Sequence, residues 1–393
     1  MLKIFSAIIF AAIFLANNFA QAALAESVNN FSWKYFKTRN HNLNIFYSPY
    51  SIAAALGMVA NGASGDTQRE ILDALNSDSL ENLNDEFKNF QGATAANLLL
   101  IDKKYSGNGI NSNFKNTAEN FYRSEVALAD FENDLTGEQI KITGWVKKHT
   151  NNFIPNYQSI ASKYTSVDLL NVTYFKEDWL YAFRKSGTRE KIFTNKDGST
   201  CKVQMMRRTF DEEIPYYADG KYKGVALPYK NSGAAMFVIL PVDENNLNIA
   251  DDWDAESFSY RENFLNQIKS AGIFDGEIYL DLPKFELDLG DSLPESLWKV
   301  GIQRAFTDYA QFYNIINGVS LKIDDAAHQA KIRVDETGTE AAAVTEITMV
   351  ETTAVAPDFK RSVEFRADRP FFFVIRDVES GVDLFAGAVN NLD

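Results

Sequence analysis

The sequence of 393 residues predicts an α+β protein with a large mixed sheet. Helical spacing of apolar residues dominates the first third of the chain, whereas apolar runs rich in β-formers become frequent from Leu169 onward. No Pro- or Ser-rich linker interrupts the chain, and no internal repeat is visible. Helices first and strands later in one uninterrupted chain are typical of the α+β class.

Three segments are expected to form helices. Pro49 precedes the Ala-rich segment Ser51–Val59, in which apolar residues recur at helical intervals. The segments Thr67–Leu75 and Ile140–Ile154 show the same amphipathic pattern. Buried strands are expected at Leu169–Phe175, Ala234–Leu240, Glu277–Leu282, Phe371–Arg376 and Leu384–Val389.

The first 25 residues show the sequence of charged, apolar and small residues that is typical of a secretory signal peptide. Lys3 is followed by an apolar run from Ile4 to Ala16 and then by two small-x-small sites, Ala20-Gln21-Ala22 and Ala23-Leu24-Ala25. The alternative is a membrane anchor, but this run is shorter than the roughly 20 residues that span a bilayer. We expect cleavage after Ala25, a single domain over residues 26–393, and a secreted protein that is extracellular or periplasmic.

Charge and cysteine content exclude several classes of partner and cofactor. The 39 Lys and Arg residues and 53 Asp and Glu residues give a net charge of −14, which argues against a nucleic-acid surface and against a heparin-type cofactor. The single cysteine, Cys201, rules out an internal disulfide and a cysteine-rich metal site. The sequence contains no second long apolar run of the kind that spans a membrane. No cofactor is expected.

No catalytic motif is present, so we do not expect an enzyme. A Ser-His-Asp triad is geometric and stays open at this point, but each histidine has a simpler interpretation. His41 lies in a polar turn and is expected at the surface, and His149 is expected on the exposed face of its helix. His328 lies among small residues of a strand and is expected to be a buried, hydrogen-bonded structural residue.

Residues 334–358 run from a strand through a glycine into a series of small residues. The alternatives are a helix, which alanine favours, and a plain surface loop. Read with a period of two, the segment has one uncharged face and one face that carries Glu340 and Glu346. The uncharged face consists of Thr339, Ala341, Ala343, Thr345, Ile347 and Met349. We therefore expect a loop that is patterned to become a strand of a half-buried sheet.

Motifs along almost the whole mature chain resemble those of the serpin family. They are Asn44–Ile52, Leu169–Trp179, Val203–Met206, Leu227–Tyr229, Leu282–Phe285, Glu336–Ala343 and Phe365–Phe371. The resemblance implies the serpin fold, with N-terminal helices around a mixed five-stranded main sheet, smaller sheets, and an exposed reactive loop over about residues 336–362.

The resemblance also implies a monomeric suicide-substrate inhibitor of serine endopeptidases, with cysteine endopeptidases as a further target class. In this mechanism, the protease cuts the loop and forms an acyl-enzyme, and the cut loop inserts into the main sheet as a new strand. The distorted protease then cannot complete deacylation. Small hinge residues allow insertion to occur before deacylation.

The resemblance assigns site residues position by position. The hinge is Glu336, Gly338, Thr339, Glu340, Ala341, Ala342 and Ala343. The shutter, the cluster that lets the sheet open, is Ser48, Ser51, Asn171 and His328, and the breach residue beneath the start of the loop is Trp179. Thr337 and Val344 depart mildly from the family pattern, but neither belongs to the inward-facing set.

The usual interval after Glu336 places the scissile bond at Thr352–Thr353. Counting back from Pro370 instead places it around residues 356–359, and the two counts cannot both hold. We prefer the hinge count, because the length of the inserted strand determines where the protease ends. Small residues around this bond suit an elastase-like protease, whereas Lys360 or Arg361 would suit a trypsin-like protease.

Two alternative functions remain open. Within the family, the alternative is a non-inhibitory serpin such as a carrier or chaperone. A proline or bulky charge among the inward-facing hinge residues would favour it, and none is present at Thr339, Ala341 or Ala343. Outside the family, the alternative is a hydrolase or a periplasmic binding protein.

Overall fold

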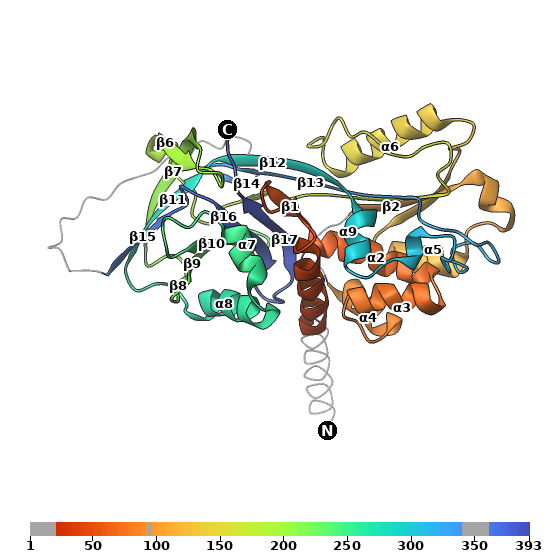
Figure 1. Cartoon of the computed structure of the whole chain (residues 1–393), viewed down its shortest axis with the longest axis horizontal. Coiled ribbons are helices and arrows are strands. Elements are labelled where there is room, and N and C mark those ends of the chain that lie inside the picture. Colours follow the sequence, from red (N-terminus) through yellow and green to blue (C-terminus); the bar gives the residue numbers. More distant parts are fainter. Residues whose placement is uncertain (1–20, 91, 93–95, 340–360) are drawn as a thin grey trace, which may run out of the picture.

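The computed structural model describes residues 21–90, 92, 96–339 and 361–393. These residues form three β-sheets, and helices lie on both sides of the largest one (Figure 1). We call this sheet the main sheet. Its strands in spatial order are β3 (Glu125–Ala129), β2 (Ala96–Asp102), β4 (Val167–Tyr174), β13 (Asp325–Val334), β14 (Gly338–Thr339) and β5 (Glu177–Asp178), and β12 (Phe285–Ser292) also pairs with β13.

The main sheet is mixed, as the sequence predicts. β4 is parallel to β13, and β2 is parallel to β3, whereas β2 is antiparallel to β4 and β12 is antiparallel to β13. β5 and β14 are only two residues long. The described main sheet therefore has seven strands, five of them longer than two residues, where five strands in all were expected from the sequence.

Strand residues alternate between two apolar layers, so both faces of the main sheet are buried. Leu98 and Leu100 of β2 pack in one cluster with α6 (Leu135–His149), whereas Leu99 and Ile101 belong to the core on the opposite face. That opposite face is covered by α2 (Pro49–Gly62), α3 (Gly65–Ala74), α4 (Leu80–Asn89) and α5 (Ser112–Phe121). Figure 1 shows α6 above the sheet and these four helices below it.

Local sequence explains where α2 and α6 begin and end. Ser48 caps α2 by accepting a 3.1 Å hydrogen bond from the Ser51 N–H, and Pro49 occupies its first turn. The prediction of a helix over Ile140–Ile154 is wrong at both ends. Asp134 caps α6 earlier, and the helix stops at His149 because Asn151 and Asn152 adopt positive φ angles of 47° and 66°.

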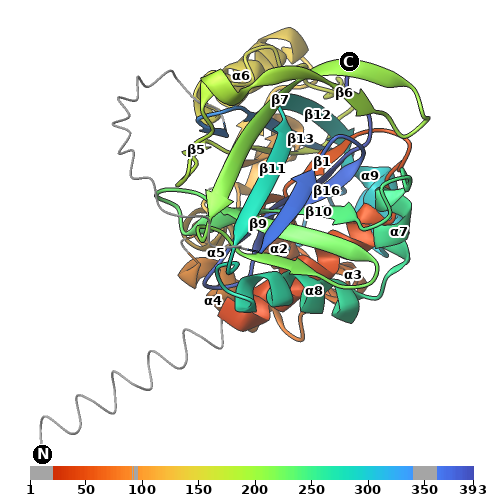
Figure 2. The same cartoon turned by 90° about the vertical axis from the view of Figure 1, so that its left-hand side faces the viewer.

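The other two sheets lie together at one end of the molecule, which faces the viewer in Figure 2 with β7, β11, β16 and β10 labelled. One contains β1 (Ile45–Tyr47), β17 (Asp383–Val389), β16 (Phe371–Asp377), β10 (Ala234–Pro241), β9 (Tyr222–Pro228) and β8 (Tyr216–Ala218). The other contains β15 (Ser362–Arg366), β11 (Glu277–Pro283), β7 (Thr200–Asp211) and β6 (Arg189–Thr194). All five strands predicted from the sequence are present, as β4, β10, β11, β16 and β17.

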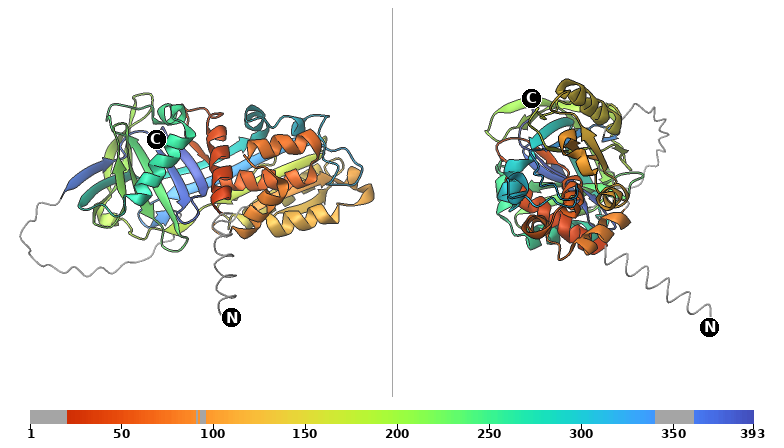
Figure 3. Two further views of the ribbon diagram at one scale, coloured as in Figure 1. Left: turned by 90° about the horizontal axis from the view of Figure 1, so that it is seen from below. Right: turned by 90° about the vertical axis from the view of Figure 1, so that its right-hand side faces the viewer.

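The remaining helices complete the two halves of the molecule. They are α7 (Ile249–Ala255), α8 (Phe258–Ser270) and α9 (Leu293–Lys299). A helix over residues 21–36, called here the N-terminal helix, lies between α7 and α8 on one side and the helices under the main sheet on the other (Figure 3). Across the part of the chain that the structure describes, no helix has both the length and the hydropathy needed to span a bilayer.

Candidate functional site: the main-sheet seam and the loop hinge

The four predicted shutter residues come together in the middle of the main sheet, although they are far apart in the sequence. Ser48 and Ser51 lie at the start of α2, Asn171 lies in the centre of β4, and His328 lies directly beside Asn171 on the parallel strand β13. All four side chains are buried. We call the line of contact between β4 and β13 the seam.

A continuous hydrogen-bond network joins these four residues. The Ser48 N–H donates to His328 Nε2 over 3.1 Å, so Nδ1 carries the ring proton and donates to the side-chain oxygen of Asn171. The amide of Asn171 donates to Ser51 Oγ over 2.6 Å, and Ser48 Oγ donates to the Leu384 carbonyl over 2.6 Å. Burial lowers the pKa of His328 to about 3, so the imidazole is neutral at physiological pH.

Asn97 is a further member of this network that sequence reasoning missed. It lies on β2 opposite Asn171, it is 1% exposed, and its side-chain oxygen accepts from the Asn171 amide. The one available signal was a polar amide in the otherwise apolar run Ala96–Ile101. The network therefore links the three neighbouring strands β2, β4 and β13 to the start of α2. The seam cannot open without breaking these hydrogen bonds.

The breach residue Trp179 lies where the hinge begins. Its indole N–H donates to the Asp335 carbonyl over 3.0 Å, and its main-chain N–H donates to the Thr337 carbonyl over 2.9 Å. The indole stacks on Tyr229 with ring centroids 4.6 Å apart. Tyr229 in turn shares a 2.7 Å hydroxyl hydrogen bond with Thr339, which is fully buried.

Two of the predicted hinge residues, Gly338 and Thr339, are paired within the main sheet. Gly338 and Thr339 form β14, which lies between β5 and the end of β13 and is antiparallel to both. A Cβ atom on Gly338 would come within 2.2 Å of the Glu177 carbonyl oxygen, so only glycine fits at this position. The hinge residues Glu340, Ala341, Ala342 and Ala343 and the predicted bond Thr352–Thr353 lie outside the described residues.

Glu336 anchors the chain just before β14. Its carboxylate accepts from Thr188 Oγ1 over 2.7 Å and forms a 2.9 Å ion pair with Lys284. Burial acts to raise the pKa of Glu336, but the hydrogen bonds from Lys284 and Thr188 outweigh it and hold the pKa below its ordinary value. The main-chain carbonyl of Glu336 also accepts from the Phe183 N–H over 2.8 Å, so the start of the loop is fixed on two sides.

Below β14, β4 and β13 pair directly along the seam from Asp168–Asp325 to Tyr174–Lys331. A strand that extended β14 downward would have to separate these pairs and would then be antiparallel to both neighbours. Asp168 and Asp325 face each other at the far end of this path. Burial, together with the nearby Asp325 carboxylate, raises the pKa of Asp168 to about 7.

The far end of the loop is anchored at Arg361. The Arg361 carbonyl accepts from the Glu277 N–H over 2.8 Å, and from Ser362 onward the chain is β15, parallel to β11. The guanidinium of Arg361 lies over the Phe274 ring, 5.4 Å from its centroid. The described residues on either side of positions 340–360 are thus paired through their main chains, Gly338 and Thr339 with the main sheet and Arg361 and β15 with the four-stranded sheet.

The other two histidines lie outside this network. His41, expected at the surface, has a side chain that is only 12% exposed, because it stacks on Phe36 and contacts Asp251. His149 pairs with Glu125 over 3.0 Å on the far side of the main sheet. Within the ranges 21–90, 96–339 and 361–393, no group of three or more His, Cys, Asp or Glu side chains is arranged to bind a metal.

Comparison with known proteins agrees with this geometry. The family model described as "Serpin (serine protease inhibitor)" matches residues 26–392. A serpin-like protein of Thermococcus kodakarensis is 31% identical over 382 residues, which cover 94% of this chain and 85% of the relative. The native thermophilic serpin tengpin has a TM-score of 0.81 at 25% identity, with 94% of each chain covered. Human thyroxine-binding globulin has a TM-score of 0.80 at 26% identity, with 95% and 99% covered.

Proposed function

Because the chain belongs to the serpin family, we propose that it is a secreted suicide-substrate inhibitor of serine endopeptidases. Members of this family are in general protease inhibitors and not enzymes. The observation that carries the proposal is β14, because Gly338 and Thr339 already occupy the position from which a new strand would grow along the seam. The residues that follow on the inward-facing side, Ala341 and Ala343, are small.

The proposed reaction begins with attack of the protease serine hydroxyl on the Thr352 carbonyl. The peptide bond to Thr353 breaks, a new amino terminus leaves on Thr353, and an ester joins Thr352 to the protease. Each inserted residue gains main-chain hydrogen bonds with β4 and β13, and burial of Ile347 and Met349 contributes about 1.5–3 kcal/mol each. Insertion carries the ester away from its starting position before water can hydrolyse it.

The pairing of Arg361 supports a cut at Thr352–Thr353, the bond found by counting from Glu336, over a cut by a trypsin-like protease beside Arg361. A cut beside Arg361 would fall where the chain is already paired with Glu277, and the Arg361 side chain is engaged with Phe274. Trypsin-like proteases need an extended basic side chain that enters a deep pocket. We therefore propose an elastase-like target that cuts at Thr352–Thr353, next to the small residues Ala354 and Val355.

The test is incubation of the purified mature protein with pancreatic elastase and, separately, with trypsin, followed by denaturing gels and sequencing of the released peptide. We expect an SDS-stable complex with elastase and a peptide that begins at Thr353 or within two residues of it. A complex formed only with trypsin, with a peptide that begins after Lys360 or Arg361, would overturn the assigned bond.

The second candidate function is that of a non-inhibitory carrier. It is favoured by the similarity to thyroxine-binding globulin, whose name states that it binds thyroxine. Clean cleavage of the loop by a broad panel of serine and cysteine proteases, with no covalent complex for any of them, would favour this candidate.

A further inference from the structure

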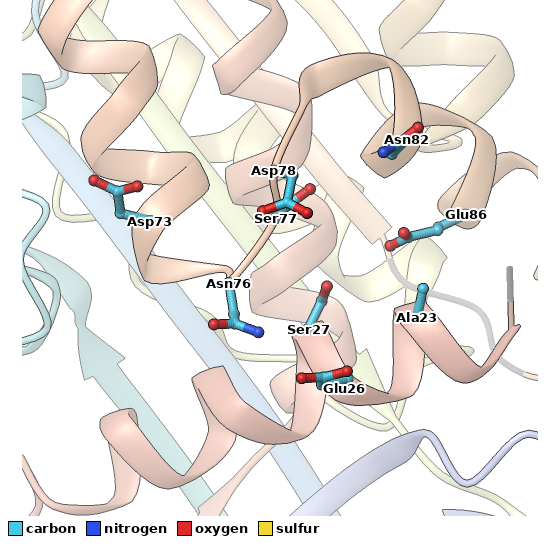
Figure 4. A pocket seen from close by; sticks show the side chains of 9 residues that line it. All are labelled: Ala23, Glu26, Ser27, Asp73, Asn76, Ser77, Asp78, Asn82 and Glu86. Carbon is cyan, nitrogen blue, oxygen red and sulfur yellow. The ribbon is translucent and has the colours of Figure 1, made fainter. Parts of the chain in front are cut away.

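A polar cavity of about 470 Å³ lies between the N-terminal helix, the end of α3 and the helix α4 (Figure 4). Its wall carries four carboxylates, those of Glu26, Asp73, Asp78 and Glu86, and Ala23 lies beside Glu86 at one side of the cavity. Lys34, on the same helix as Glu26, donates instead to the main-chain carbonyls of Asp73 and Ala74. The cavity is therefore suited to a small cationic group.

Glu86 is the buried one of these four carboxylates, whereas Glu26, Asp73 and Asp78 are exposed. It is 8% exposed, and within the described residues its Oε2 atom is buried and makes no hydrogen bond. Figure 4 shows its side chain directed from α4 into the cavity, toward the turn of the N-terminal helix that contains Ala23. Burial raises the pKa of Glu86 to about 7, which is the expected behaviour of a carboxylate without a counter-charge. A cation placed beside it would restore the ionised form.

The N-terminal helix shows which residues the folded domain needs at its start. Leu24, Val28, Phe31 and Tyr35 recur at helical spacing, and each is fully buried. Leu24 is thus the first member of the apolar stripe that seats this helix in the core. Cleavage after Ala25 would remove it, whereas cleavage after Ala22, at the other small-x-small site, would keep it.

We propose that the leader is cut between Ala22 and Ala23 and that the new α-ammonium group of Ala23 enters this cavity and pairs with Glu86. Hydrolysis of the peptide bond consumes one water molecule and leaves a carboxylate on Ala22 and an ammonium group on Ala23. The shortened helix would also begin beside this acidic wall, and negative charge near a helix amino terminus is stabilising. The proposal rests on export of the chain, which is part of the proposed function, and it places the cut three residues before the expected site after Ala25.

The first test determines the amino terminus of the protein that a secreting host exports from the full chain. Intact-mass measurement and amino-terminal sequencing are expected to give a chain that begins at Ala23. A chain that begins at Glu26, or one that keeps its leader, would overturn the assigned cut. Trapping of elastase, measured on the same sample, reports on the inhibitor proposal separately, because it does not depend on which of the two sites is cut.

The second test concerns the ion pair and uses chains released from a fusion so that they begin at Ala23 without export. The pKa of the Ala23 amine, followed by NMR after ¹³C reductive methylation, is expected to lie above the ordinary range of about 7.7–8.0. Glu86→Gln is expected to return this pKa to that range, whereas Glu81→Gln, a change at an exposed position of the same helix, is expected to leave it raised. An amine with an ordinary pKa in the unchanged chain would contradict the pairing.

Melting temperatures provide a third test, which does not require methylation of the Ala23 amine. Glu86→Gln is expected to lower the melting temperature of the chain with a free Ala23 amine. In a chain whose Ala23 amine is acetylated, the same substitution is expected to leave the melting temperature unchanged or raise it, because a buried unpaired carboxylate is removed. An equal effect in both chains would show that the amine and Glu86 do not interact.

Discussion

At the scale of single residues, His328 links the two halves of the seam because it donates and accepts at the same time. Its Nε2 atom accepts from Ser48, and its Nδ1–H donates to Asn171. Protonation of Nε2 would remove the acceptor for the buried Ser48 N–H. Burial within the closed sheet lowers the pKa of His328, so the imidazole stays neutral and keeps both hydrogen bonds at physiological pH.

Replacement of the imidazole provides the first prediction. His328→Ala leaves the Ser48 N–H and the Asn171 oxygen buried without partners, and we expect the free energy of unfolding to fall by about 2–4 kcal/mol at pH 7.5. Denaturant titration measures this loss, with His149→Ala as the control at a more exposed position. A change no larger than that of the control would contradict the role given to the network.

The pH dependence of this loss provides the second prediction. Because the folded-state pKa of His328 lies below its unfolded value, its contribution is complete above about pH 6.5 and declines as the pH falls toward 3. The stability difference between the unchanged protein and His328→Ala should therefore shrink as the pH is lowered from 7 to 4. A difference that stays constant over this range would indicate that the imidazole is not neutral and hydrogen-bonded in the native state.

Some residues of the site could be predicted from sequence, whereas others required the fold. The resemblance to serpins assigned all four shutter residues, which the structure brings together, although His328 lies in none of the seven motifs. Asn97 was missed because its importance depends on a register across β2 and β4 that no local pattern reveals. The partial burial of the His41 side chain was missed for a similar reason, since its partner Asp251 lies 210 residues away in the sequence.

At the scale of secondary-structure elements, β14 is the part of the site that connects the fold to the proposed mechanism. It is only two residues long, yet it lies between two strands and its Thr339 side chain is fully buried. Its position determines where further strand residues would enter. A change that excludes β14 from the sheet should therefore affect insertion more than it affects the overall fold.

Gly338→Ala tests this point. The added methyl group would overlap the Glu177 carbonyl oxygen, so we expect β14 to leave the sheet and insertion after cleavage to slow. Slower insertion gives the acyl-enzyme time to hydrolyse, and the number of inhibitor molecules consumed per protease trapped should rise several-fold. Gly107→Ala, where the added atom would meet open space, is the control. An unchanged partition between trapping and hydrolysis would contradict the role of β14.

The far end of the seam provides a second prediction at this scale. Since the pKa of Asp168 is raised by folding, the contribution of this residue to stability is complete below its unfolded pKa of about 3.8 and is lost as the pH rises through about 7. Asp168→Asn should therefore stabilise the intact protein by about 1–3 kcal/mol at pH 8 and have little effect at pH 4. Thermal melts at both pH values measure this, with exposed Asp275→Asn as the control. A gain of equal size at both pH values would show that Asp168 does not titrate as described.

Elements with a strong local pattern were predictable, and those defined by tertiary pairing were not. The five predicted strands were found because strands buried on both faces read as apolar runs. The limits of α6 were misplaced because Asp134 at one end and the two positive-φ asparagines at the other decide them, and the apolar pattern does not. β14 was expected only as a loop able to become a strand, because its pairing depends on the gap between β5 and β13.

At the scale of the whole molecule, the proposed function requires that the intact fold is not the most stable arrangement of the chain. One strand position of the main sheet is occupied only beside β5, by β14. Along the rest of this position, β4 and β13 pair directly with each other. Filling this position with residues after Thr339 would add a central strand with two hydrogen-bonded neighbours. Single-cysteine composition leaves this rearrangement free of disulfide restraint.

The most direct test of this claim is thermal unfolding before and after the loop is cut by a protease that is not trapped. Insertion of the cut loop predicts that the cleaved protein melts tens of degrees above the intact protein, because the filled sheet replaces a closed but strained one. A cleaved protein that melts at or below the temperature of the intact protein would show that the loop does not insert, and would contradict the proposed mechanism.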